Sequence, residues 1–276
     1  MRVDVVTAAH SAYANFLPAT WLSLNAQTHT AWRWLVQCDG KGTAVRNALI
    51  ACGASDDSRV QIAANGTQEG PAVTRNVALG RSSAALIQNL DADDELEPTA
   101  LAALAQALEN HPAAGYAAGP ARDLLSSGAL VDFPLPLEPG RLQRGALVDA
   151  WITTSDDYRV PVHPAGVMWR RDLLLALGGW SAMSDMEDTG LLMAASALCE
   201  GVLIDTPTLR YRRHRAQRSK KSSGFVGGGG EQITLVRQRT ALLRRGPSWR
   251  PALPPHSEDW DRASESPVPE QQPMQA

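Results

Sequence analysis

The chain has 276 residues, and its 26 lysines and arginines against 29 aspartates and glutamates leave a formal net charge of -3. With 44% hydrophobic and 20% charged residues the composition is globular, which excludes a wholly disordered, collagenous or coiled-coil chain. The near-neutral charge argues against a nucleic-acid-binding protein, which usually carries a basic excess. The three cysteines (Cys38, Cys52 and Cys199) are too few and too scattered for a disulfide framework, so we expect a reduced, cytoplasmic setting.

Residues 5–32 lack Asp, Glu, Lys and Arg, which raises the question of a membrane span. The same stretch contains His10, Asn15, Asn25, Gln27 and His29, whose polar groups are costly to place in hydrocarbon. No signal-peptide pattern precedes it. We therefore expect a soluble protein without a transmembrane segment.

Strand and helix patterns alternate over the first 110 residues. The expected strands are 3–7, 32–38, 59–63 and 84–90, and the expected helices are 17–24, 45–53, 70–80 and 98–110. This alternation predicts an α/β fold with a mostly parallel sheet covered by helices on both faces. Ligands of such sheets bind beyond the carboxyl ends of the strands, so the loops with His10, Asp39 and residues 91–94 are expected to converge.

The pattern weakens between about residues 115 and 160, where Pro134, Pro136 and Pro139 indicate irregular loops. The elements expected after it are a strand at 167–169, helices at 171–177 and 185–197, and a strand at 202–204. Residues 209–221 are strongly basic, and 227–230 have the composition of a flexible hinge. A basic amphipathic helix with Val236 is expected next, followed by a proline-rich disordered tail.

Two acidic groups could carry chemistry. Asp91, Asp93 and Asp94 follow a buried strand, where their charges repel unless a cation or strong donors offset them. Mg²⁺ and Mn²⁺ take such carboxylates together with phosphate oxygens, whereas the alternative is a solvated acidic turn that caps the next helix. Glu187 and Asp188 begin a predicted helix, where they are either capping residues or a general base for an acceptor hydroxyl.

Four segments, in the same order, resemble family 2 glycosyltransferases. The first is VDVVTAAHSAYANFLPATWLSLNAQTHTAWRWLVQCDG, which contains Ser-Leu-x-x-Gln-Thr at residues 23–28. The second and third are the Arg-Asn helix and the Asp-x-Asp-Asp motif, both within GPAVTRNVALGRSSAALIQNLDADDELEP. The fourth is MWRRDLLLALGGWSAMSDMEDTGLLMAA, which contains the Gly-Gly-aromatic and Glu-Asp motifs. The resemblance covers roughly residues 1–215 and implies the GT-A fold, a Rossmann-like sheet with a nucleotide-sugar half and an acceptor half.

The implied organisation is a GT-A domain over 1–222, with a nucleotide-sugar half at 1–112 and an acceptor half at 113–222. A Gly-rich hinge and basic helix at 223–246 and a disordered tail at 247–276 would follow. The resemblance implies that the donor site uses the residues Thr7, Ala9, His10, Asp39, Arg75, Asp91 and Ala92. Departures from the family pattern at residues 8–10 and 38 leave the donor nucleotide open among UDP, TDP and GDP.

The resemblance also implies a divalent ion, Mn²⁺ or Mg²⁺, held by Asp93, Asp91 and His214, between the two phosphates of the donor. Asp188 matches the family's catalytic base and would deprotonate the acceptor hydroxyl during a single, inverting displacement. The acceptor, a glycan, a lipid-linked sugar or a small molecule, is not identified by these motifs. The oligomeric state is equally open.

Two alternatives remain. A nucleotidyltransferase could share this architecture, although it would need a Gly-rich basic loop after the first strand, where this chain has TAAHSAYAN. A non-catalytic nucleotide-sugar or partner-binding module could also use the fold, with the basic segment at 209–221 as its docking surface. That segment could instead close over phosphates, and the basic helix could touch an anionic membrane surface.

Overall fold

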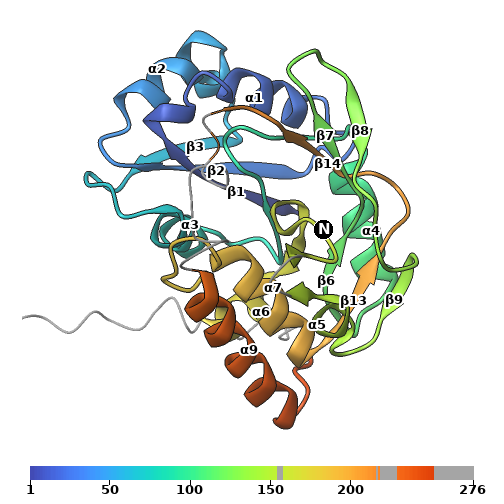
Figure 1. Ribbon diagram of the computed structural model, residues 1–276. Helices are drawn as coiled ribbons and strands as arrows, with labels where there is room; N and C mark the ends of the chain where they lie inside the picture. The colour runs from blue at the N-terminus through green and yellow to red at the C-terminus, as the bar shows by residue number, and fades with distance from the viewer. Residues whose placement is uncertain (154–157, 216, 218–228, 252–276) are drawn as a thin grey trace, which may run out of the picture.

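A mixed eight-stranded sheet forms the centre of the protein (Figure 1). The computed structural model describes residues 1–153, 158–215, 217 and 229–251. The strands of the central sheet, in spatial order, are β3 (Val60–Ala64), β2 (Trp32–Asp39), β1 (Val3–His10), β4 (Leu86–Asn89), β12 (Met168–Arg170), β6 (Ala114–Ala118), β13 (Glu200–Leu203) and β9 (Gly140–Leu142). Strands β1 to β4 are mutually parallel, as are β6 and β13, whereas β12 and β9 run antiparallel to their neighbours. The expected α/β fold with a mostly parallel central sheet is therefore confirmed.

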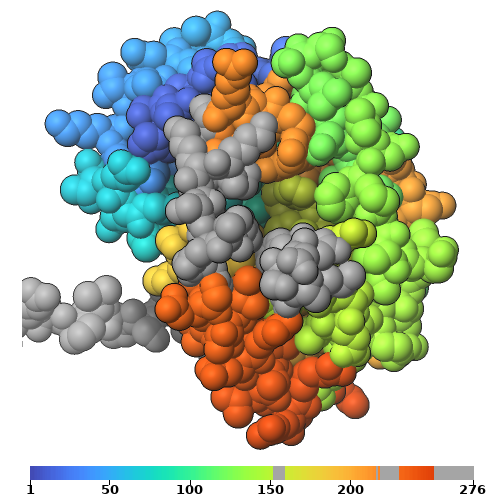
Figure 2. Space-filling view, in the orientation of Figure 1, coloured from blue at the N-terminus to red at the C-terminus, as the bar shows by residue number. Residues whose placement is uncertain are grey.

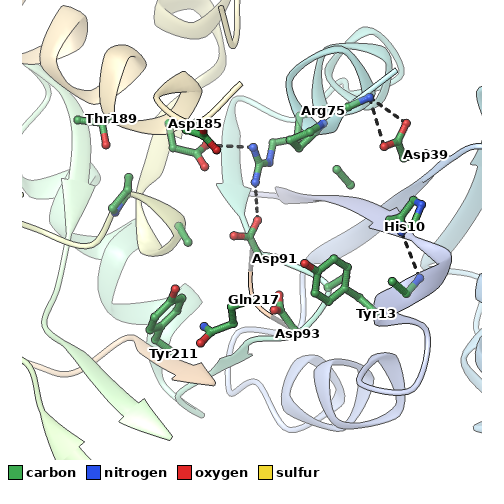
Figure 3. Close-up of a pocket in the computed structure, with 18 of the residues that line it drawn as sticks. His10, Tyr13, Asp39, Arg75, Asp91, Asp93, Asp185, Thr189, Tyr211 and Gln217 are labelled. Carbon is green, nitrogen blue, oxygen red and sulfur yellow. Dashed lines mark hydrogen bonds and ion pairs between the residues drawn. The ribbon is translucent and has the colours of Figure 1, made fainter. Parts of the chain in front are cut away.

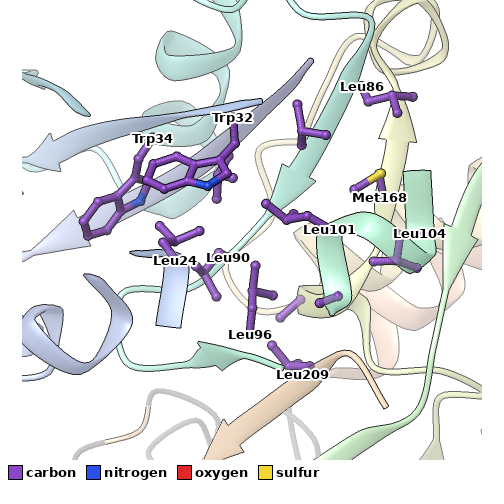
Figure 4. Close-up of a cluster of buried hydrophobic side chains, with 14 of the residues drawn as sticks. Leu24, Trp32, Trp34, Leu86, Leu90, Leu96, Leu101, Leu104, Met168 and Leu209 are labelled. Atoms are coloured by element: carbon purple, nitrogen blue, oxygen red, sulfur yellow. The ribbon is translucent and has the colours of Figure 1, made fainter. Parts of the chain in front are cut away.

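Helices cover both faces of this sheet. Their bounds are α1 (Leu17–Asn25), α2 (Thr43–Ala51), α3 (Pro71–Gly80), α4 (Ala100–Asn110), α5 (Ala146–Ala150), α6 (Arg171–Leu177), α7 (Glu187–Leu198) and α9 (Gly229–Arg245), with short 3₁₀ turns η1 (Ser11–Tyr13), η2 (Ala54–Asp56) and η3 (Pro164–Gly166). Because side chains alternate along a strand, neighbouring residues of β2 enter different cores. Trp34 belongs to one buried cluster with Leu24 of α1 and Leu101 of α4 (Figure 4), whereas Leu35 belongs to another with residues of α3, α6 and α7.

The register of β1 and β2 determines where the donor-site residues lie. Val3 pairs with Trp32 and the pairing continues without interruption to His10 and Asp39. Both side chains therefore stand at the carboxyl ends of adjacent strands, as the alternation of elements predicts. The turn that begins at Asp91 follows β4, which pairs with β1 on its other side.

A second, four-stranded sheet lies beside the Asp91–Asp94 turn. Its order is β5 (Glu95–Leu96), β14 (Leu209–Arg212), β7 (Ala121–Leu124) and β8 (Leu130–Asp132), and a separate pair is β10 (Ile152–Thr153) with β11 (Tyr158–Arg159). Ion pairs join the first three strands, since the guanidinium of Arg210 lies 2.8 Å from Glu97, which also binds Arg122. Arg212 likewise binds Glu95.

The expectation of irregular loops between 115 and 160 is thus wrong for much of that region. Strand β6 has the sequence AGYAA, whose small residues give no strand pattern, yet all five are buried. Small residues are needed there because neighbouring strands and side chains approach closely: a Cβ at Gly201 of β13 would lie 2.3 Å from the ring of Tyr116. Tertiary packing rather than strand propensity therefore determines β6.

The predicted C-terminal helix is present as α9, and it packs against α7 with Val236 buried between them. Trp249 falls within the predicted tail, but its ring joins the core below the sheet and its backbone N–H donates to Leu198 O at 3.0 Å. The ordered chain therefore extends past residue 247. Residues 216 and 218–221 of the basic 209–221 segment, residues 223–228 of the predicted hinge and the tail from 252 lie outside the described residues.

Where the chain is described, none of its helices combines the length and the apolar character that a membrane crossing needs.

Arg144 fixes the C-terminal end of α9 to the domain. Its guanidinium donates to the carbonyls of Leu243, Arg244 and Gly246 and to the carbonyl of Ala197 in α7. We expect Arg144→Ala to lower the free energy of unfolding by about 2–4 kcal/mol, because several carbonyls lose a charged donor. Chemical denaturation would measure this loss.

Arg141→Ala is the matched control. Arg141 pairs with Glu200 on the surface, three residues earlier in the same segment, and exposed pairs contribute little to stability. Equal stability of Arg144→Ala and the parent would show that α9 is not held by these bonds.

Candidate active site

A cavity of about 570 Å³ opens at the carboxyl ends of β1, β2 and β4. Figure 2 shows this face of the molecule, which is hollowed near its centre, with the blue and cyan N-terminal residues on one side and the green residues that follow residue 115 on the other. Its charged and polar lining comprises His10, Tyr13, Asp39, Gln68, Arg75, Asp91, Asp93, His163, Asp185, Asp188, Thr189, Tyr211 and Gln217 (Figure 3). Residues from both halves of the predicted domain therefore meet in one place.

The three aspartates of the acidic turn have different environments. The hydroxyls of Thr7 and Thr20 hold the turn by donating to Leu90 O at 2.7 Å and to Ala92 O at 3.0 Å. Asp91 and Asp93 line the cavity, whereas Asp94 is 1% exposed and accepts a hydrogen bond from the backbone of Arg212 at 2.9 Å.

Burial and the two neighbouring carboxylates raise the pKa of Asp94 well above its usual range. The alternative of a simple solvated acidic turn therefore does not describe this segment.

Arg75 joins the acidic turn to the start of α7. One end of its guanidinium donates to Asp91 Oδ1 at 2.6 Å, and the other lies 3.3 Å from Glu187 Oε1 and 3.2 Å from Asp188 Oδ1. The Arg75 side chain is only 4% exposed. Burial alone would lower the pKa of Arg75, but Asp188, Asp91 and Glu187 together raise it, so this guanidinium is permanently charged.

The two acids at the start of α7 are not equivalent. Glu187 is 1% exposed, whereas Asp188 is 17% exposed and lines the cavity. Asp188 Oδ1 also accepts a hydrogen bond from the indole of Trp180 at 2.8 Å, which orients the carboxylate. Trp180 is itself buried, so it supports Asp188 rather than offering a stacking surface.

His214 lies against the acidic turn, although 121 residues separate it from Asp93. Its Nε2 is 2.8 Å from Asp93 Oδ2, and its ring packs 4.5 Å from that of Phe16. Gln217 fixes the intervening turn, because its amide donates to Arg212 O at 2.6 Å and accepts from the His214 backbone at 3.1 Å. Sequence motifs gave no indication of this role of Gln217.

The residues fit a divalent ion that is shared with a ligand. Within the described parts of the chain, no three His, Cys, Asp or Glu side chains are grouped as a metal site. Asp91 and Asp93 nevertheless line the cavity in the same turn, and the imidazole of His214 contacts Asp93. Mg²⁺ and Mn²⁺ are commonly bound by one or two carboxylates with substrate phosphates completing the shell. This donor set suits such an ion.

The other end of the cavity is formed by His10 and Asp39. The Asp39 carboxylate accepts hydrogen bonds from the backbone of Glu69 at 2.7 Å and Gly70 at 3.1 Å, which fixes the start of α3. His10 Nδ1 accepts from Ala12 N at 3.2 Å. Both side chains line the cavity on the side away from Thr189 and Tyr211 (Figure 3).

Two of the expected donor-site residues do not face the cavity. Thr7 is fully buried, and its hydroxyl is engaged with Leu90 O and with the indole of Trp34, while Ala9 is 1% exposed in the core. The reason is the two-residue period of β1, which directs Thr7 and Ala9 to one face and Ala8 and His10 to the other. Ala8 takes the place at the cavity that we expected for Ala9.

Several lining residues had no motif to identify them. His163, Tyr211, Asp185 and Thr189 come from three separate segments, and only the tertiary fold brings them to the cavity. The one signal in the sequence was the position of Asp185 and Thr189 beside the Glu187-Asp188 pair.

Arg75 should be essential to the folded state because it is the shared ion-pair partner of three carboxylates. We expect Arg75→Met to lower the free energy of unfolding by about 3–5 kcal/mol, since it leaves uncompensated charge in a buried site. Arg75→Lys should recover only part of this, because a lysine cannot reproduce the guanidinium fork. Denaturant unfolding would measure both changes.

Arg81→Met, at the other end of α3, is the control, because Arg81 binds only the neutral oxygens of Val36 and Gln37. It should cost about 1 kcal/mol. A loss of the same size at both positions would contradict the role given to the three carboxylates.

Residues 4–129 match the family described as "Glycosyl transferase family 2". No curated protein matches the chain. Among solved structures, the chain resembles S. aureus TarS 1-349 in complex with UDP-GlcNAc, with a TM-score of 0.68 and 15% identity over 88% of this chain and 66% of that one.

The chain also resembles the mannosyltransferase PcManGT from Pyrobaculum calidifontis in complex with GDP-Man and Mn²⁺. The TM-score is 0.57 and the identity 16%, over 91% of this chain and 66% of that one. It thus spans less than two thirds of either solved chain, and 39% of a longer TarS structure. Likeness at this identity establishes the fold. The chain therefore has the GT-A fold, and its residues 4–129 are similar to glycosyltransferase family 2.

Proposed function

We propose that the protein is an inverting, metal-assisted glycosyltransferase that moves a sugar from a nucleoside-diphosphate sugar to an acceptor hydroxyl. The main support for this proposal is that Asp91 and Asp188 both bind the guanidinium of Arg75 and line the same cavity. The first carboxylate belongs to the acidic turn of the donor half and the second to the acceptor half. A transfer reaction needs both groups at the same sugar.

His10 and Asp39 would face the nucleoside of the donor, at the end of the cavity next to α3. The diphosphate would then lie at Asp91 and Asp93, beside His214. Asp93 and His214, with Asp91, would hold a Mn²⁺ or Mg²⁺ ion. Such an ion offsets the charge that develops on the leaving nucleoside diphosphate. The structures of TarS with UDP-GlcNAc and PcManGT with GDP-Man and Mn²⁺ support a UDP- or GDP-linked donor and a divalent ion, while TDP remains open.

Asp188 would act as the general base. Its carboxylate is oriented by Trp180 and Arg75 and accessible from the cavity, so it can take the proton of an acceptor hydroxyl as that oxygen attacks the anomeric carbon. The new bond forms on the face opposite the leaving diphosphate, which inverts the configuration in one displacement. Arg75 holds Asp188 in place, and it would meet the diphosphate only by exchanging Asp91 for a phosphate oxygen.

Nucleotidyl transfer is the weaker candidate because residues 11–13 after β1 form a short 3₁₀ turn without a glycine or a basic residue. A non-catalytic binding module is disfavoured by the cost of bringing Glu187, Asp188 and Asp91 together around a buried arginine. The free thiols of Cys38, Cys52 and Cys199 support the reduced, cytoplasmic setting that we propose.

The first test concerns the base. We expect Asp188→Asn to reduce release of nucleoside diphosphate from the donor by about 10²–10⁴-fold, because the amide cannot accept the proton, while donor binding is retained. Turnover with an acceptor panel and calorimetric binding of the donor would measure the two effects. Glu187→Gln is the matched control and should keep most of the turnover. Full turnover by Asp188→Asn would refute the assignment.

The second test concerns the metal. Asp93→Asn and His214→Gln should weaken the binding of Mn²⁺ in the presence of nucleoside diphosphate by about tenfold, since each removes one ligand. Electron paramagnetic resonance of Mn²⁺ reports this directly. Asp94→Asn, at the adjacent buried position, should bind Mn²⁺ as the parent does. Equal binding by all three variants would place the ion elsewhere.

A further inference from the structure

One wall of the cavity has no part in the chemistry described so far. It is formed by η3 and the residue before it, His163, together with Tyr211 of β14. Directly after η3, Val167 O accepts the backbone N–H of Asn89 at 3.4 Å, and Met168 pairs with Gln88. The wall therefore runs beside the strand that leads into the acidic turn.

The place of this wall relative to the reacting groups is fixed by the cavity. Tyr211 and Thr189 lie on one side of Asp91, and His10 and Asp39 lie on the other (Figure 3). If the nucleoside occupies the His10 end and the diphosphate lies at the acidic turn, the sugar has to extend toward the Tyr211 end, where Asp188 also lines the cavity.

The ring of His163 is held rigidly. It packs 4.3 Å from the ring of Tyr211 and meets Phe133 edge-on at 6.5 Å. Its Nδ1 is buried, and no residue in the described part of the chain makes a hydrogen bond to it. Because His163 lines the cavity and its hydrogen-bonding capacity is not used up by the described residues, its imidazole can bind a ligand there.

The imidazole of His163 is neutral in the physiological range. Burial lowers its pKa to about 4, with Asp91 opposing the shift and Arg213 adding to it. A neutral imidazole offers one donor and one acceptor, which suits a hydroxyl or an acetamido group. It cannot balance the charge of a carboxylate.

The charged groups around His163 also favour a neutral sugar. The described lining contains Asp39, Asp91, Asp93, Asp185 and Asp188, and its single guanidinium, that of Arg75, is bound to three carboxylates. A carboxylate on the donor sugar would add negative charge beside these aspartates, and the nearby guanidinium of Arg213 is itself paired with Asp123.

We propose that His163 is a specificity-determining residue of the donor-sugar subsite, where its ring nitrogens bind a hydroxyl or acetamido group of a neutral sugar, and that the site discriminates against uronic acids. This inference rests on the proposed function. It assigns to the donor-sugar subsite a residue of the acceptor half that neither the motifs nor the family match identifies. It also restricts the donor sugar to neutral sugars.

Calorimetric titration in the presence of Mn²⁺ with UDP, UDP-GlcNAc and UDP-glucuronic acid tests it, with GDP and GDP-mannose as a second series. We expect His163→Phe to weaken nucleotide-sugar binding by about 5–20-fold and nucleoside-diphosphate binding by less than about twofold. His163→Gln, whose amide keeps a donor and an acceptor, should recover part of the difference. The parent should bind UDP-glucuronic acid at least about tenfold more weakly than UDP-GlcNAc.

His10→Gln, at the nucleoside end, is the matched control and should weaken both kinds of ligand by the same factor. Thermal unfolding checks that each variant is folded. If His163→Phe leaves the ratio of the two affinities unchanged, or if UDP-glucuronic acid binds as well as UDP-GlcNAc, the inference is wrong while the donor site stands. If the folded parent binds no nucleotide at all, the proposed function itself fails, and the sugar subsite with it.

Discussion

The buried guanidinium of Arg75 is the constraint on which the site depends. Asp91, Glu187 and Asp188 come from two distant parts of the chain, and their charges would repel one another without it. Their joint field keeps Arg75 charged in spite of burial, so neither side of the arrangement is stable alone. This mutual dependence fixes the acidic turn relative to the first turn of α7, and it sets the geometry of any reaction between them.

The four-stranded sheet beside the Asp91–Asp94 turn fixes the position of His214 in a similar way. Strand β14 is tied to β5 and β7 by ion pairs, above all those of Arg210 and Arg122 with Glu97. The Arg212 side chain then donates to Asp93 O at 2.9 Å, so the chain that leaves β14 reaches the acidic turn at a fixed place. His214, which we propose as a metal ligand, is thereby held beside Asp93 although more than a hundred residues separate the two.

The sequence allowed the fold to be predicted wherever the hydrophobic pattern was strong, as in β1, β2 and α3. It failed at β6, where small residues are required by close packing and leave no pattern. In the site, Asp91, Asp93, Arg75 and Asp188 were found because they form local motifs. Thr7 and Ala9 were expected at the cavity because the motif identifies the strand but not the face of the sheet on which each side chain lies. His163 has no local sequence motif, since only the tertiary fold brings it to the cavity.

The most direct measurement is a calorimetric titration of the protein with UDP, GDP and TDP, each with and without Mn²⁺. A donor site built from the acidic turn and His214 predicts that one of the nucleotides binds, and that Mn²⁺ strengthens this binding. Binding of none of them, by protein shown to be folded, would contradict a nucleotide-sugar site in this cavity.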